Sequence, residues 1–192
     1  MRKIILASRS KARQRLLRQI GLKFHVVEPD VKESSSLRGK SCGALVIDNA
    51  VVKARAAAKG YHTGVVIAAD TVVLAGKRII GKPKTMADAV RSLKLLSKNP
   101  QWVFTGIAVY DVDRDRTLTG FEKTKVYMYP LNDKQIKRYF CKVSPFDKAG
   151  SFDVQGPGSV FIDRIEGCFY NVVGLPLAKL GAMLKKVGVN II

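Results

Sequence analysis

The chain has 192 residues, of which 47% are hydrophobic and 26% are charged, a length and composition typical of one folded domain and not of a disordered chain. We therefore expect a single domain over residues 1–192, with a core large enough to fold without a disulfide or a structural metal. The 34 lysines and arginines outnumber the 15 acidic residues, and the resulting formal charge of +19 favours an anionic partner: nucleic acid, acidic lipid or a phosphorylated small molecule.

The first third of the chain is predicted to alternate strands with helices. An apolar run over residues 3–7 predicts a short buried strand. Apolar residues at steps of four, from Ala12 to Ile20, then predict a helix that ends at Gly21. The next predicted elements are a strand over 24–27, a polar loop over 28–41 and a long alanine-rich helix over 42–59.

The rest of the chain predicts more strands than helices. The most apolar strand, over 65–69, is expected to end at Asp70. Thr85, followed three residues later by Asp88, is typical of a helix N-cap with its capping acid. The other predicted elements are a hairpin over 72–80, a helix from 85 to 97, strands over 102–110 and 118–128, a helix over 132–142, strands over 152–154 and 159–165, and a helix over 176–187. This order predicts an α/β fold with a mixed sheet.

The junction between the first strand and the first helix is a candidate phosphate site. Ser8 and Ser10 lie where a helix N-terminus presents free backbone N–H groups and the positive end of its dipole. Arg13, in the first helical turn, can add a bidentate contact to phosphate. Composition alone favours the alternative, a plain helix cap at Ser10 and solvated arginines.

Two carboxylates are candidates for catalysis or metal binding. Asp70 follows the most apolar strand, and open α/β sheets bind ligands at the carboxyl ends of their strands. Such a carboxylate can hold a divalent cation or accept a proton from water, and the alternative is an Asx turn that ends the strand. Glu33, in the polar loop, can complete a metal site or lie solvated on the surface.

Two lysines stand in settings that suit a phosphate contact. Lys53 lies inside the alanine-rich helix, and Lys82 lies between Gly81 and Pro83, just after a predicted strand. Either ammonium can neutralise phosphate as a point charge. With 34 basic residues in the chain, each lysine can also be an ordinary solvent-facing one.

Eight short motifs follow one another along the chain. They occupy residues 5–17, 53–54, 69–73, 81–83, 104–106, 147–152, 155–156 and 171–177. Each is weak alone, but their order and spacing from residue 4 to about 184 resemble the Maf family of nucleoside triphosphate pyrophosphatases.

This resemblance implies a fold and an activity. The fold is a single α/β domain with a mixed twisted sheet, flanking helices and two lobes around a cleft, similar to that of the inosine triphosphate pyrophosphatases. The activity is hydrolysis of the α–β phosphate bond of a nucleoside triphosphate to the monophosphate and pyrophosphate, with a divalent cation, Mg²⁺ or Mn²⁺. Family members are often homodimers, and some are linked to arrest of cell division.

The resemblance also assigns roles to the candidate residues. Asp70 matches the family's catalytic proton acceptor and, with Glu33, a metal-binding position. The positions expected to bind substrate are Ser8, Arg13, Lys53 and Lys82, to which we add Ser10 because its backbone amide lies in the same junction.

Base specificity is expected to depend on Ala12, Thr71 and Gln155. Thr71 and Gln155 resemble the branch that acts on dTTP and UTP, whereas the branch acting on 7-methyl-GTP has Gln and Glu there. The dTTP/UTP branch usually reads Ser-Pro-Arg-Arg where this chain has Ser-Lys-Ala-Arg, so Ala12 replaces an arginine associated with base choice. Its loss can broaden selectivity without removing catalysis, and Lys11 can replace part of the missing charge.

Two other functions remain open. The charge of +19 also suits a non-enzymatic nucleic-acid-binding protein, and the family suggests a cell-division regulator without catalysis. The basic residues are spread along the chain, and aromatic residues such as Trp102 fall in predicted strands, so we do not expect nucleic acid as a partner.

The remaining sequence patterns bear on the cellular compartment of the protein. Cys42, Cys141 and Cys168 lie far apart, which indicates reduced thiols and a reducing environment. The apolar run near the N-terminus is too short for a signal peptide, and no stretch approaches the roughly 18 apolar residues of a membrane span. We expect a cytoplasmic protein that does not bind membranes.

Overall fold

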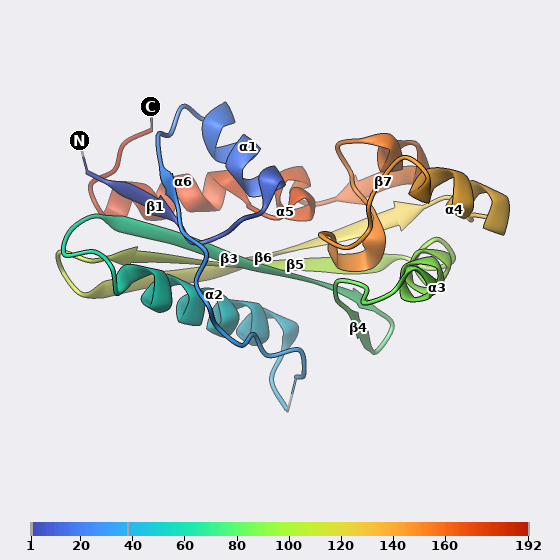
Figure 1. Ribbon diagram of the computed structural model, residues 1–192, viewed down its shortest axis with the longest axis horizontal. Helices are drawn as coiled ribbons and strands as arrows, with labels where there is room; N and C mark the ends of the chain where they lie inside the picture. The colour runs from blue at the N-terminus through green and yellow to red at the C-terminus, as the bar shows by residue number, and fades with distance from the viewer. Residues whose placement is uncertain (1, 38, 192) are drawn as a thin grey trace.

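A computed structural model describes residues 2–37 and 39–191, and its centre is one mixed sheet (Figure 1). The strand order is β2-β1-β3-β5-β6-β7, with β4 paired to β3. β1 is parallel to both of its neighbours, and the other pairs are antiparallel. The strands are β1 (Ile4–Leu6), β2 (His25–Val26), β3 (Val65–Ala75), β4 (Arg78–Ile80), β5 (Gln101–Asp111), β6 (Arg116–Met128) and β7 (Ile162–Glu166). The predicted α/β fold with a mixed sheet is confirmed.

Helices cover both faces of this sheet (Figure 1). One face carries α1 (Lys11–Gln19), α5 (Phe169–Val173) and α6 (Leu177–Lys186), the other carries α2 (Cys42–Ala58), and α3 (Met86–Leu96) and α4 (Asp133–Phe140) lie near β7 at one end. Side chains alternate along β3, so Ile67 packs with α1 and α6 while Ala68 packs against α2. The 3₁₀ helices are Ala149–Ser151 and Pro157–Phe161. The cleft between two lobes stays a prediction.

Several local predictions are confirmed. Helix α1 ends before Gly21, which has a φ of 74° and so adopts the left-handed conformation that glycine tolerates. Thr85 and Asp88 form the expected capping box, in which the backbone N–H of each donates to the side chain of the other at 3.1 Å.

The prediction that the apolar strand ends at Asp70 is wrong. β3 continues through Asp70 to Ala75, because β5 pairs with it from Val65 to Leu74. The partner strand supplies backbone hydrogen bonds along this whole length, so one polar side chain does not end the strand. Asp70 therefore lies in the middle of the sheet.

The predicted strand over 152–154 is also wrong. Residues 152–156 have no regular secondary structure, and the chain from Pro157 to Phe161 forms a 3₁₀ helix before β7 begins at Ile162. Proline lacks the N–H that a strand ladder uses. The N–H of Gly158 instead donates to Asp153 Oδ1 at 2.9 Å. Helix α5 was not predicted because five residues show too little periodicity.

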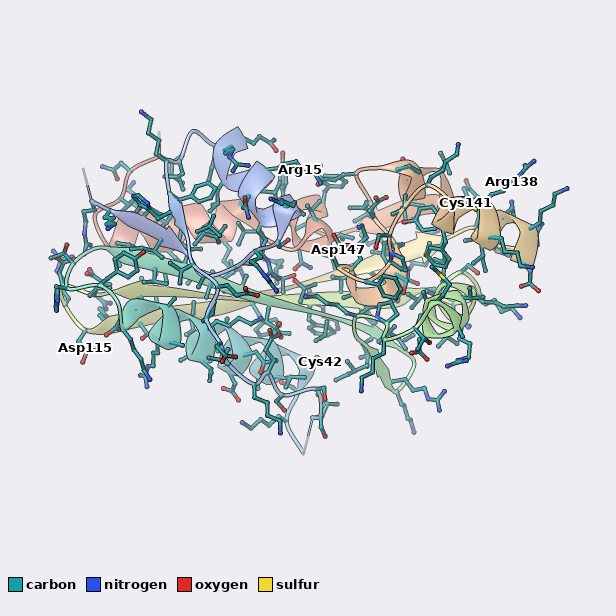
Figure 2. The ribbon with its side chains drawn as sticks, in the orientation of Figure 1. Arg15, Cys42, Asp115, Arg138, Cys141 and Asp147 are labelled. Carbon is teal, nitrogen blue, oxygen red and sulfur yellow. The ribbon has the colours of Figure 1, made fainter. Side chains whose placement is uncertain are left out.

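The three cysteines are free, as predicted. Cys42 is buried at the start of α2, and Cys141 is exposed just after α4, at a different place in the fold (Figure 2). Cys168 is half-buried. In the described part of the chain, no helix is long and apolar enough to span a bilayer.

Helix α2 approaches the sheet most closely at Gly106 of β5. A Cβ atom at this position would lie 2.4 Å from the carbonyl oxygen of Val46, so only glycine allows the contact. Gly106 is paired with Asp70 across the β3–β5 ladder. The close approach therefore brings α2 down onto the part of β3 that carries Asp70.

Gly106→Ala is expected to lower the free energy of unfolding by about 3 kcal/mol, because the added methyl group forces α2 away from the sheet. Gly60→Ala is the matched control, since a Cβ there meets no atom within 4 Å, and we expect a change within about 0.5 kcal/mol. Urea denaturation measures both values. Equal effects of the two substitutions would contradict the close contact.

Candidate functional site

One edge of β3 contains a gap in its pairing. Strand β5 pairs with one edge of β3 along nearly its whole length. On the opposite edge, among the described residues, β1 pairs with residues 65–67 and β4 pairs with residues 73–75, which leaves residues 68–72 without a partner strand. β1 is parallel to β3 and β4 is antiparallel, so both strands run toward the gap and end there. Ser8 and Lys82, each two residues past the end of its strand, therefore lie on either side of Asp70 and Thr71.

Two neighbouring residues of β3 face opposite sides of the sheet at this gap. Successive side chains of a strand alternate, so Asp70 faces α2 and Thr71 faces the layer of α1 and α5. Each of them is the centre of one polar cluster.

The cluster around Asp70 is held by a lysine. Lys53 Nζ of α2 donates to Asp70 Oδ1 at 2.8 Å and to the carbonyl oxygen of Ala69 at 3.3 Å. It also lies 2.8 Å from Glu33 Oε2. The side chains of Lys53 and Asp70 are each only 9% exposed, whereas that of Glu33 is 47% exposed. One ammonium group thus joins a buried and a half-exposed carboxylate.

Asn49 completes this cluster, and our sequence analysis missed it as a site residue. Its Nδ2 donates to Asp70 Oδ2 at 2.8 Å and to the Ser34 carbonyl oxygen at 2.9 Å, and its Oδ1 accepts from the Ser34 N–H at 2.9 Å. Asn49 and Lys53 are four residues apart, so they share one face of α2. A polar residue in an otherwise apolar, alanine-rich face was the signal available in the sequence.

The surroundings of Asp70 keep it ionised. Burial raises the pKa of its carboxyl group, but the charge and hydrogen bond of Lys53, together with the hydrogen bond from Asn49, outweigh burial and place the pKa below its ordinary value. Asp70 is therefore a carboxylate at neutral pH, able to bind a cation and, while Lys53 holds it, a weak base.

The second cluster centres on Arg13 of α1. Its Nη2 donates to Thr71 Oγ1 at 3.0 Å, its Nη1 donates to Ser8 Oγ at 3.2 Å, and its Nε donates to the Gly174 carbonyl oxygen at 2.8 Å. The guanidinium is thus fixed by β3, by the chain after β1 and by the end of α5. The three contacts use three different nitrogens of one planar group, a spread that the single nitrogen of a lysine does not have.

The two clusters interact electrostatically. Burial lowers the pKa of Arg13, while the negative charges of Asp70 and Glu33 raise it, and the group keeps its charge at neutral pH. The cationic groups of Arg13 and Lys53 thus lie on the two faces of the sheet at the same gap.

The junction before α1 is a helix cap. Ser10 is the N-cap residue of α1 and its Oγ accepts from the Arg13 N–H at 3.4 Å, while Ser8 Oγ accepts from the Ser10 N–H at 3.3 Å. Ala12 is half-buried in the first turn of α1. The helix cap predicted at Ser10 is confirmed, but the solvated arginine of the same alternative is wrong for Arg13, which makes three hydrogen bonds within the protein. A phosphate role at this N-terminus stays a prediction.

Two predicted site residues are not joined to these clusters. Lys82 and Gln155 are exposed, and within residues 2–37 and 39–191 neither side chain makes a hydrogen bond or ion pair. The loop carrying Lys82 is tied to the 3₁₀ helix Ala149–Ser151, because the Gly150 N–H donates to the Gly81 carbonyl oxygen at 3.2 Å. No group of three or more metal-ligating side chains occurs in the described part of the chain.

The chain is similar to known proteins over its whole length. Residues 3–187 match the profile of the family described as "Maf-like protein". A dTTP/UTP pyrophosphatase of Dictyoglomus turgidum is 42% identical over 193 residues, covering 100% of both chains. Those of Methanosarcina barkeri and Clostridium botulinum are 42% identical over 191 residues and 41% identical over 194 residues, covering 100% of this chain and 97% and 100% of theirs.

Proposed function

The chain belongs to the Maf family, and we propose that it hydrolyses the α–β phosphate bond of dTTP and UTP to the monophosphate and pyrophosphate. The observation that carries this proposal is the gap beside β3, where Lys53 joins Asp70 to Glu33 and Arg13 lies on the opposite face. The two cations suit a substrate that is an anionic chain of phosphates, and the two carboxylates suit the divalent cation that accompanies such a chain.

The cationic groups would bind the phosphate tail. Arg13 offers a planar guanidinium, and the backbone N–H groups that follow Ser10 at the N-terminus of α1 would donate to phosphate oxygens. Lys53 and Lys82 would add point charges. Phosphate transfer depends mainly on positioning and on stabilising charge that develops on the leaving group, so these groups would supply most of the catalysis.

Asp70 would take the proton from the attacking water. Its low pKa makes it a weak base as long as Lys53 Nζ donates to it. A phosphate oxygen competing for the same ammonium would weaken that hydrogen bond and raise the proton affinity of Asp70. Substrate binding would thus strengthen the base at the moment it is needed.

Asp70 and Glu33 also fit a divalent cation. Both carboxylates contact the Lys53 ammonium group, so they lie close to each other. Mg²⁺ is usually bound through one or two carboxylates plus substrate phosphates. Mg²⁺ or Mn²⁺, when bound, would supply further positive charge that stabilises the charge developing on pyrophosphate.

Base choice would fall to Ala12 and Gln155, with Thr71 acting indirectly. The hydroxyl group of Thr71 accepts from Arg13 and lies 2.9 Å from Thr105 Oγ1, so it is engaged in holding the arginine. The expected homodimer and the cytoplasmic location stay predictions.

A panel of nucleotides assayed for pyrophosphate release tests this function. We expect dTTP and UTP to be cleaved with one pyrophosphate for each monophosphate, with activity lost in a chelator and restored by Mg²⁺ or Mn²⁺. Release of orthophosphate instead of pyrophosphate would contradict the proposal. So would oligonucleotide binding that weakens steeply with salt in a chain that cleaves no nucleotide.

A further inference from the structure

The polar segment between β2 and α2 passes across the sheet beside the gap and carries Glu33 (Figure 1). Residues 27–37 of this segment have no regular secondary structure, so their position depends largely on side-chain contacts. Two of these contacts are exposed ion pairs near its ends, Arg9 with Glu28 and Lys40 with Asp48. Exposed pairs of this kind contribute little, about 0 to 1 kcal/mol each.

The middle of the segment is held by buried groups of α2. Asn49 and Lys53 are 5% and 7% exposed, and they contact Ser34 and Glu33, two adjacent residues of the segment. The contact of Lys53 with this segment is to the Glu33 side chain, whereas Asn49 binds the backbone N–H and the carbonyl oxygen of Ser34. Asn49 therefore fixes the path of the main chain itself.

The amide of Asn49 is fully used in this arrangement. An asparagine side chain has one acceptor oxygen and two N–H hydrogens. The oxygen accepts from the Ser34 N–H, and the nitrogen donates to the Ser34 carbonyl oxygen and to Asp70 Oδ2. An aspartate has the same shape but no N–H, so asparagine alone of these two can bind both a carbonyl oxygen and a carboxylate.

We propose that Asn49 is a positioning residue that fastens the segment carrying Glu33 to Asp70 and so sets the separation of the two carboxylates that share Lys53. This inference rests on the proposed function, in which that pair acts on the substrate. Without Asn49, the half-exposed Glu33–Lys53 pair, the exposed end pairs and the packing of Leu37 against the apolar residues of α2 would be left to hold the segment, and none of these fixes the main chain at Ser34. The Glu33 carboxylate would then sample a range of positions relative to Asp70.

The test combines kinetics with amide hydrogen exchange on the full chain. For Asn49→Ala we expect kcat for pyrophosphate release to fall roughly 10- to 100-fold, with KM changed less than about three-fold, because Arg13 is untouched. We also expect exchange over residues 28–37 to accelerate at least about ten-fold, while β3 keeps its protection. Asn49→Leu, which keeps the branched shape without adding a charge beside Asp70, provides a second variant, and circular dichroism establishes that each variant folds.

Ser34→Ala and Asp48→Asn are matched controls. The first removes a hydroxyl from the same segment but leaves its backbone bonds to Asn49, and the second removes an exposed ion pair of the same segment. We expect both to stay within about two-fold of wild type in kcat and in exchange. A folded Asn49 variant with wild-type exchange over 28–37, or with kcat within two-fold, would overturn the inference. Hydrogen exchange is measured without a nucleotide, so it tests the position of the segment independently of activity. A wild-type chain without pyrophosphatase activity would contradict the proposed function, and this result is distinct from a failure of the inference on Asn49.

Discussion

Asp70→Asn is expected to lower kcat for pyrophosphate release from dTTP about 10³-fold, which corresponds to about 4 kcal/mol of lost transition-state stabilisation. Asparagine keeps the shape of the side chain but removes the negative charge that Lys53 and Asn49 hold in place. It can neither accept a proton from water nor contribute a carboxylate to a divalent cation. The proposal makes Asp70 the base, so no other single substitution is expected to cost as much activity.

Asp133→Asn is the control for this experiment. Asp133 lies on α4, its side chain is 64% exposed and its partner is the exposed Lys94, so we expect turnover within about two-fold of wild type. Circular dichroism and a melting curve establish that both variants fold. A folded Asp70→Asn variant with turnover within ten-fold of wild type would show that Asp70 is not the catalytic base.

Lys53→Met is expected to lower the free energy of unfolding at pH 7.5 by about 3 to 5 kcal/mol, because it leaves the buried Asp70 carboxylate without its cation. Methionine fills a similar volume, so little of this loss comes from packing. Urea denaturation in the presence of a chelator measures it without a competing metal. The exposed pair of Lys94 with Asp133 gives the matched control, and Lys94→Met is expected to cost less than about 1 kcal/mol.

The loss caused by Lys53→Met is also expected to depend on pH. In the wild type, the pKa of Asp70 lies below its ordinary value, so the pair stabilises the fold above that value and loses its contribution as the pH falls. In the variant, burial acts without the ammonium and raises the pKa of Asp70, so protonation at mildly acidic pH removes the penalty. The difference between the two proteins should therefore shrink between pH 7.5 and pH 5. A constant difference would mean that the loss is not electrostatic.

The polar residues of the helix caps and of the two clusters differ in how well the sequence predicted them. Ser10 and Thr85 were identified because an N-cap bonds to residues three positions away, within one short segment. Asp70, Lys53 and Arg13 were singled out one at a time, and the resemblance grouped them. Asn49 was missed because its partners Ser34 and Asp70 lie 15 and 21 residues away in the chain, where no local pattern can reveal them.

The sequence by itself determined the order of most helices and strands, the mixed sheet and the family, because periodicity, caps and motif order are local properties of the chain. The tertiary structure decided that β3 continues through Asp70, since its length depends on pairing with β5 rather than on its own residues. It also decided which charges meet. The Lys53–Asp70 contact requires α2 to lie against Gly106, and contacts between distant segments follow from strand register and helix placement, which no single segment encodes.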